Sequence, residues 1–397
     1  MKINSIRYPL TNTNLDNDDI KSGINVLKSK WITMGRETLK FEKEFSKQIS
    51  KRSSIMVNSG SSANLLIFQC LINPMVKKLK TNDEVLLPAI CWSTSLWPII
   101  QSGLKVKFVD IDLKTLNIDI NDLKKKITKK TKALMLVHAL GNCADMQKIV
   151  KICKMNKIIL IEDTCEALGS KHKGKQLGTF GDFSSYSFFY SHHISTMEGG
   201  MCVTDNFELY CILKSLRAHG WSRDLPKINT LTKSLSKSKQ AEYNFVLPGY
   251  NLRPNELNGV LGLTQLKKLP HFLEGRKENA RFFKKLFDNQ PYCSIQKCDY
   301  DSSWYGFSIL LEGALKNKRD YVLNELHNVG IETRPIVTGN FLKNSVCDFM
   351  NYEISGILKN VESVDRRGFF VGNSHINLEN QLLKLSETLQ KLYKNIN

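Results

Sequence analysis

GTFGDFSSYSFFYSHHISTMEGGMCVTD, residues 178–205, predicts a strand, an exposed turn and a second strand. The turn carries two adjacent histidines, His192 and His193, and Gly199 and Gly200 lead the chain into the second strand. Functional side chains collect where strands end and loops begin when helices cover a sheet. We therefore expect chemistry at this turn.

Short apolar runs alternate with helical patterns upstream of the turn. The runs are SIMVNSG, EVLLPA, VKFVDID, ALMLVHAL and IILIEDT, between residues 54 and 164. This alternation favours a parallel or mixed sheet covered by helices on both faces, which is an α/β fold. The sequence contains no internal repeat.

The predicted organisation has three parts. Residues 1–20 form an N-terminal arm, 21–269 a large domain and 270–397 a smaller C-terminal α+β domain. The last boundary follows the helical pattern ELNGVLGLTQLKKL, and SSWYGFSILLEG beyond it predicts a strand. The polar stretch at 225–242 is rich in lysine and serine, so we interpret it as an exposed excursion.

The charge of the chain favours anionic partners in general. The sequence holds 57 basic and 38 acidic residues, a formal net charge of +19. The lysines are scattered, which argues against a nucleic-acid or membrane-binding role, and either a solvated surface or a phosphate-carrying substrate accounts for the charge.

The cysteines and the apolar runs argue against metalloproteins, secreted proteins and membrane proteins. The ten cysteines form no C-x-x-C or C-x-C pair, so we expect no metal or iron–sulphur site. No signal peptide and no run of 18 apolar residues is found, so a cytoplasmic protein with reduced thiols is expected.

Two further segments carry polar groups at the ends of predicted strands. IMVNSGSSANLL places Gly60 and Ser61 at the start of a helix, where amides and hydroxyls can cradle a phosphate or simply cap the helix. IILIEDTCEALGS ends a buried strand with Asp163, followed by Glu166. An acid at such a position can hold a pyridine nitrogen protonated, although a surface acid would read the same way.

The three segments together resemble the sugar aminotransferase and dehydratase family of fold-type I pyridoxal-phosphate enzymes. WITMGRETLKFEKEF, VHALGN, RAHGWSRD, LPGYNLRPNELNGVLGLTQL and GIETRPIVTGNF follow in the order of that family, over nearly the whole chain. The resemblance implies an aspartate-aminotransferase-like fold: a large domain with a mixed, mostly parallel sheet between helices, and a smaller C-terminal α+β domain. It also implies a homodimer with shared active sites.

The resemblance implies cofactor contacts for seven residues. They are Gly60, Ser61 and Ser187 at the phosphate, Trp92 stacked on the ring, Asp163 at the pyridine nitrogen, Glu166 near the ring hydroxyl and Asn251 reaching the phosphate from the other subunit. Trp92 could instead be a core residue.

Four residues are implied at the substrate. His219 and Arg223 are placed near it, while Arg253 and Arg334 are candidate partners for a carboxylate or pyrophosphate. His219 could equally be a surface histidine.

His192 stands where relatives usually carry the lysine that binds the cofactor, and no lysine occurs between Lys175 and Lys214. The resemblance then implies a 3-dehydratase: L-glutamate converts pyridoxal phosphate to pyridoxamine phosphate, and His192 acts as base and acid in removing the hydroxyl at carbon 3 of a nucleotide-linked 4-keto-6-deoxyhexose. Ammonia is released, on the route to a dideoxysugar of a surface polysaccharide.

Two kinds of 3-dehydratase are known in the family, and cysteine spacing separates them. The kind that acts on CDP-linked sugars needs an iron–sulphur cluster, for which Cys293, Cys298 and Cys347 supply no pattern. GDP-4-keto-6-deoxy-D-mannose is therefore the favoured substrate. Two alternatives stay open: an aminotransferase that uses another lysine, and a non-catalytic homologue in which His192 is structural. His193 is interpreted as structural, orienting its neighbour.

Overall fold

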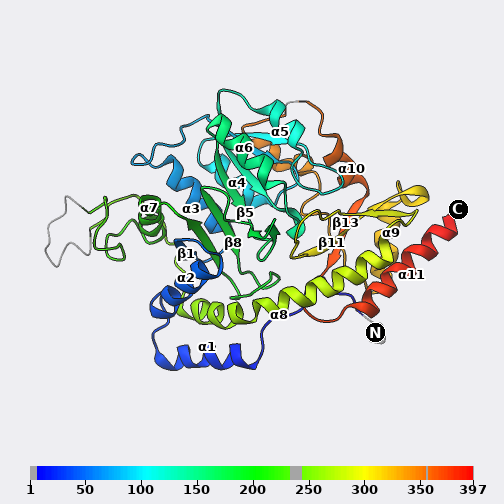
Figure 1. Ribbon diagram of the computed structural model, residues 1–397, viewed down its shortest axis with the longest axis horizontal. Coiled ribbons are helices and arrows are strands. Elements are labelled where there is room, and N and C mark those ends of the chain that lie inside the picture. Colours follow the sequence, from blue (N-terminus) through cyan, green and yellow to red (C-terminus); the bar gives the residue numbers. More distant parts are fainter. Residues whose placement is uncertain (1–6, 233–243, 355, 397) are drawn as a thin grey trace.

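Figure 1 shows the computed structural model, which describes residues 7–232, 244–354 and 356–396. Its large domain is built on an eight-stranded sheet in the order β1-β9-β8-β5-β4-β2-β3-β12. The strands are β1 (Ser53–Val57), β2 (Glu84–Pro88), β3 (Lys105–Val109), β4 (Thr131–Val137), β5 (Ile159–Asp163), β8 (Phe183–Ser187), β9 (Gly200–Thr204) and β12 (Tyr352–Glu353). Strand β9 is antiparallel to β1 and β8, and the other neighbours are parallel. The expected mixed, mostly parallel α/β sheet is confirmed.

Helices bury both faces of this sheet, as its continuous apolar strands require. Met135 of β4 packs in one core with α3 (Gly60–Ile72), α4 (Ser93–Gln101) and α7 (Phe207–Arg217). The next residues on either side, Leu134 and Leu136, enter a separate core with α5 (Ile120–Lys126) and α6 (Met146–Asn156). The carboxyl ends of the parallel strands are thereby left open between the helices.

The C-terminal part has its own sheet and core. Strands β10 (Cys293–Ile295), β11 (Gly306–Leu311) and β13 (Gly368–Gly372) form an antiparallel sheet in that order. Helices α9 (Arg319–Asn328) and α11 (Glu379–Ile396) pack apolar side chains into the same core, and α10 (Lys359–Arg367) leads into β13. An α+β domain after the large domain was expected.

Helix α8 (Glu256–Phe287) belongs to both domains, and the division proposed at residue 270 falls inside it. Its first half packs against α2 (Arg36–Gln48), with Leu266 and Leu269 in a core beside β9. Its second half places Phe283 and Phe287 in the core of the small domain. In Figure 1 α8 runs along the lower side of the molecule and connects the two parts.

The N-terminal segment also touches both domains. Tyr8 bridges Ile331 in parallel, and its hydroxyl donates to the carbonyl oxygen of Gly372 at 2.8 Å. Helix α1 (Asn17–Ser29) begins inside the segment proposed as an arm at 1–20, because Asp16 caps it. Of the excursion expected at 225–242, residues 233–242 lie outside the described residues. Among the described helices, none has the length and apolar character needed to cross a membrane.

Candidate active site

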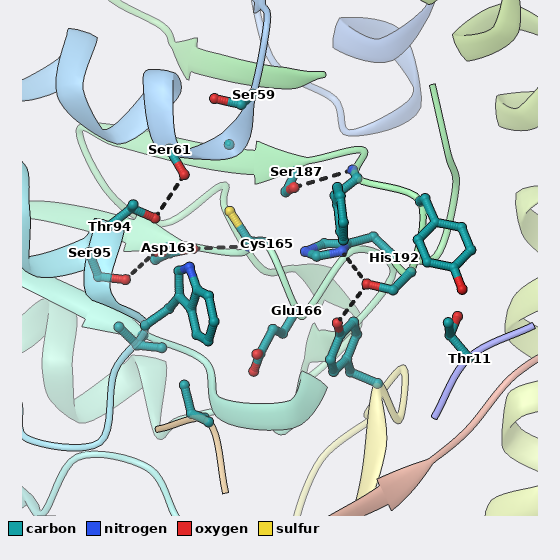
Figure 2. A pocket seen from close by; sticks show the side chains of 18 of the residues that line it. Thr11, Ser59, Ser61, Thr94, Ser95, Asp163, Cys165, Glu166, Ser187 and His192 are labelled. Carbon is teal, nitrogen blue, oxygen red and sulfur yellow. Dashed lines mark hydrogen bonds between the residues drawn. The ribbon is translucent and has the colours of Figure 1, made fainter. Parts of the chain in front are cut away.

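A cavity of about 630 Å³ opens at the carboxyl ends of β4, β5 and β8 (Figure 2). Helix α3 points its N-terminus at it, and the turn between β8 and β9 closes one side. Eight of the predicted site residues line this cavity: Gly60, Ser61, Trp92, Asp163, Glu166, Ser187, His192 and Arg334.

The N-terminus of α3 and the hydroxyl groups of Ser61 and Ser187 form an anion cradle. Ser59 caps the helix by accepting the N–H of Ser62 at 3.0 Å, and the Ser61 hydroxyl donates to that of Thr94 at 3.0 Å. Gly60 lies so close to β8 that an added Cβ would be 2.6 Å from the Cβ of Ser187. A helix N-terminus favours negative charge, so the lack of a side chain at Gly60 and the hydroxyls of Ser61 and Ser187 fit a phosphate group.

Asp163 is fixed as a hydrogen-bond acceptor at the end of β5. Its Oδ2 accepts Asn64 Nδ2 at 3.0 Å and the Ser95 hydroxyl at 2.8 Å, while Oδ1 accepts the N–H of Cys165 at 3.1 Å. These contacts hold the carboxylate toward the cavity without a basic side chain as partner. Trp92 stands at the start of α4 with 55% of its surface exposed, so it is not a core residue.

Glu166 is a carboxyl group whose protonation changes near neutral pH. Burial raises the pKa of Glu166 to about 7; the hydrogen bond from the Leu140 N–H opposes this rise, and the charge of Asp163 adds to it. The Leu140 N–H donates to Oε2 at 2.8 Å. Glu166 can therefore donate or accept a proton within the cavity.

His192 is held in the turn after β8 by its backbone. Its N–H donates to the carbonyl oxygen of Phe189 at 2.9 Å, and its own carbonyl oxygen accepts Asn14 Nδ2 at 2.9 Å. Burial, together with the charge of Arg276, lowers the pKa of the His192 imidazole to about 3. The side chain is thus a neutral imidazole, able to accept a proton. The described residues that line the cavity include no lysine.

Four predicted site residues lie away from this cavity, in what we call the Trp221 cluster: Asn251, His219, Arg223 and Arg253 around Trp221. The guanidinium groups of Arg223 and Arg253 lie 4.4 Å and 5.7 Å from the centre of the Trp221 ring, and the His219 ring lies 4.8 Å from it. Arg253 Nε donates to Asn251 Oδ1 at 3.0 Å. One chain therefore does not bring these residues to its own cavity.

Sequence reasoning missed several residues that complete the cavity. Tyr305 and Ser191 contact His192, and Asn64 and Ser95 hold Asp163. Ser191 and Asn64 occur inside segments that the sequence analysis singled out, whereas Ser95 lies outside all of them. Tyr305 lies just before β11, where the sequence shows only a strand pattern, so no local signal identifies it.

Among the described residues, no group of three or more histidine, cysteine and acidic side chains is arranged to hold a metal ion. All ten cysteines are free thiols.

Comparisons with known proteins match nearly the whole chain. Residues 13–373 match the DegT/DnrJ/EryC1/StrS aminotransferase family. A GDP-4-keto-6-deoxy-D-mannose 3-dehydratase of Yersinia pseudotuberculosis is 46% identical over 389 residues, covering 97% of this chain and 99% of that protein.

Two solved structures share the fold over their full length. An E. coli GDP-4-keto-6-deoxy-D-mannose-3-dehydratase with bound hydrated PLP has a TM-score of 0.94 at 45% identity, covering 97% of this chain and 100% of its own. A GDP-4-keto-6-deoxymannose-3-dehydratase with a trapped PLP–glutamate geminal diamine also gives 0.94 at 45% identity, covering 96% and 100%. These similarities include the turn that carries His192.

The buried histidine pair predicts that acid destabilises the protein. Burial keeps the pKa of both His192 and His193 below the ordinary range, whereas the unfolded chain binds protons on them below about pH 6.5. The free energy of unfolding should therefore fall as the pH is lowered from 7 to 5. In His193→Gln this fall should be less steep, by up to about 1.4 kcal/mol per pH unit.

Urea unfolding at several pH values measures these slopes. His327→Gln is the matched control, because His327 is exposed on α9 and should leave the slope as it is. Parallel slopes for the parent and His193→Gln would show that this histidine is protonated in the folded protein.

Proposed function

The chain belongs to the DegT/DnrJ/EryC1/StrS aminotransferase family, and from this premise we propose that it is a pyridoxal-phosphate-dependent 3-dehydratase. It converts GDP-4-keto-6-deoxy-D-mannose to GDP-4-keto-3,6-dideoxy-D-mannose, with L-glutamate as amino donor and ammonia as a product. The observation that supports this proposal most is the position of His192. It lies in the turn between β8 and β9 that lines the cavity, and the described residues of the lining include no lysine. The 46% identity to a dehydratase of that activity supports the choice of substrate.

The residues of the cavity fit pyridoxal phosphate. Ser61, Ser187 and the amides at Gly60 would hold its phosphate, Asp163 its pyridine nitrogen, and Trp92 and Glu166 its ring face and ring hydroxyl. When bound and aminated by glutamate, the cofactor supplies an amino group for the 4-keto carbon of the sugar and a ring that draws electrons from it. Because Asp163 is a buried acceptor on three hydrogen bonds, it stays fixed where a protonated ring nitrogen needs it.

His192 moves the proton in this reaction. Its Nδ1 lies 3.4 Å from the Ser191 hydroxyl, so Nε2 is the ring nitrogen that faces the cavity (Figure 2). Nε2 takes the proton whose loss sends electrons toward carbon 3, and returns it to the departing hydroxyl, which leaves as water. A lysine at this position would bind the cofactor covalently and favour transfer of the amino group to the sugar. Histidine cannot, so the amino group is lost as ammonia by hydrolysis.

A homodimer would complete the site. The Trp221 cluster lies outside the cavity of its own chain. In a dimer its two arginines would reach the cavity of the partner subunit, where they suit the pyrophosphate of a bound nucleotide sugar. Helix α1 exposes Ile20, Ile24 and Leu27 at helical spacing along one face. Such an apolar stripe on an outer helix is typical of a subunit interface.

The location we propose for the protein is the cytoplasm. Free thiols and a nucleotide-sugar substrate support it.

The activity is tested with purified protein, pyridoxal phosphate, L-glutamate and GDP-4-keto-6-deoxy-D-mannose. We expect 2-oxoglutarate and ammonia to form in equal amounts, and CDP-, UDP- and dTDP-linked keto sugars to react more slowly. Release of neither product with any of these sugars would refute the proposal. Sodium borohydride separates the aminotransferase alternative, because reduction should trap no bond between cofactor and lysine.

Replacement of His192 by Asn should remove the proton carrier and leave the cofactor cradle in place. We expect kcat to fall by roughly 10²- to 10⁴-fold, the usual contribution of a general acid or base. The cofactor absorbance that remains after gel filtration should match the parent protein. A variant that turns over at the parental rate would rule out His192 as the base.

Arg223→Ala tests the contribution of the Trp221 cluster to the neighbouring subunit. Loss of a charged hydrogen bond to the pyrophosphate should raise KM for the GDP-sugar by about 10- to 100-fold. Arg281→Ala is the control, because Arg281 is 65% exposed on α8, away from the cluster. Light scattering should give the mass of a dimer. A monomer, or an unchanged KM in Arg223→Ala, would contradict a shared site.

A further inference from the structure

Tyr305 contacts the active-site histidine through a serine hydroxyl. Its hydroxyl oxygen lies 3.3 Å from Ser191 Oγ, which lies 3.4 Å from His192 Nδ1. The rings of Tyr305 and His192 meet edge to face, with centroids 5.2 Å apart. All three residues line the cavity, and Figure 2 labels His192 among the side chains around it.

The backbone of Tyr305 is fixed from two other elements. Its N–H donates to the carbonyl oxygen of Leu140 at 3.0 Å, in the loop after β4. Its carbonyl oxygen accepts Arg276 Nη1 at 3.3 Å, from the middle of α8. Arg276 is itself buried and also donates to the carbonyl oxygen of Asn373 at 2.9 Å. The phenol is thus presented to Ser191 from a rigid junction of the large and small domains.

We propose that Tyr305 is a positioning residue that sets the tautomer of His192, an inference that rests on the proposed role of His192 as the base. The phenol oxygen accepts the hydroxyl proton of Ser191. Ser191 Oγ is then left to accept the N–H at His192 Nδ1. A neutral imidazole carries one N–H, so Nε2 keeps its lone pair toward the cavity.

The hydroxyl groups of Ser191 and Tyr305 are the groups that orient the His192 ring. A carboxylate usually orients a catalytic histidine at Nδ1, but among the described residues no acidic side chain is hydrogen-bonded to His192. The titratable groups that act on the ring are His193 in the same turn and Arg276 on α8, whose charge opposes an imidazolium, while the charge of Glu166 after β5 acts on Tyr305. The Ser191 and Tyr305 hydroxyls replace the carboxylate with neutral partners, which fits an imidazole that stays unprotonated.

Tyr305 also stays a phenol under all working conditions. Burial raises the pKa of Tyr305 to about 12; the charge of Glu166 adds to this, and the hydrogen bond with Ser191 opposes it. Its own O–H is therefore always present as a donor toward the cavity that it lines. The reverse direction, with Ser191 donating to Nδ1, would put the proton on Nε2 and leave no base there.

Tyr305→Phe tests this inference directly. Without the phenol oxygen the Ser191 hydroxyl turns to donate to Nδ1, so the His192 proton moves to Nε2. Long-range proton–nitrogen spectra of cofactor-loaded protein with 15N-labelled histidine rings report the tautomer, and the His192 signals are those missing in His192→Asn. We expect the N–H at Nδ1 in the parent and at Nε2 in the variant, with kcat about tenfold lower and KM unchanged.

Two further variants make the result decisive. Ser191→Ala should likewise remove the preference for Nδ1. Tyr186→Phe is the matched control, because Tyr186 is a buried tyrosine whose hydroxyl donates to the Leu177 carbonyl oxygen at 3.0 Å, and it should change neither spectrum nor kcat. A parent protein with the proton on Nε2, or an unchanged tautomer in Tyr305→Phe, would overturn the inference. The spectra need no sugar substrate, so this outcome is separate from a failure of the proposed reaction.

Discussion

The hydrogen bonds that hold the turn between β8 and β9 are the contacts on which the active site depends. Asn14 Nδ2 donates to the carbonyl oxygens of both His192 and His193, at 2.9 Å and 3.2 Å. Gln265 on α8 donates to the Asn14 carbonyl oxygen at 2.9 Å and accepts the N–H of Ser195 at 3.2 Å. The turn is therefore clamped from the N-terminal segment and from the helix shared by both domains. Because Tyr8 also ties that segment to the small domain, the position of His192 depends on how the two domains are assembled.

The electrostatics of the cavity favour a base that starts and ends neutral. Arg276 is buried close to the two histidines, and its Nη1 donates to the carbonyl oxygens of Trp304, Tyr305 and Asn373. Its charge and the burial of the ring both disfavour an imidazolium at His192. Glu166, which also lines the cavity, has a pKa of about 7, and Asp163 is held by neutral donors. This arrangement suits a histidine that takes one proton and returns it from the same ring nitrogen, as the proposed dehydration requires.

The sequence predicted the residues that the sheet itself brings together. Gly60, Asp163, Ser187 and His192 follow apolar runs, and parallel strands carry such positions to one edge, so their meeting in one cavity follows from topology. Tyr305, Asn14 and Arg276 could not be found in this way. Each lies more than 80 positions from His192 in the sequence, inside a pattern that indicates only a strand, an arm or a helix. The sequence analysis places the division at residue 270, after the helical pattern ELNGVLGLTQLKKL, whereas α8 continues through Pro270 to Phe287. Within the Trp221 cluster, His219, Arg223 and Arg253 are predicted substrate contacts and Asn251 is a predicted phosphate contact from the other subunit. One chain alone does not bring them to its own cavity.

The mass of the nucleotide sugar formed in the presence of L-glutamate tests the central claim most directly, because it reports which reaction His192 selects. Glutamate supplies two electrons and the hydroxyl of carbon 3 leaves as water, so the account predicts a GDP-sugar lighter than the substrate by one oxygen atom. This product should keep its 4-keto group and contain no nitrogen from 15N-labelled glutamate. A GDP-sugar that retains its oxygen at carbon 3 and carries the labelled amino group at carbon 4 would contradict the account.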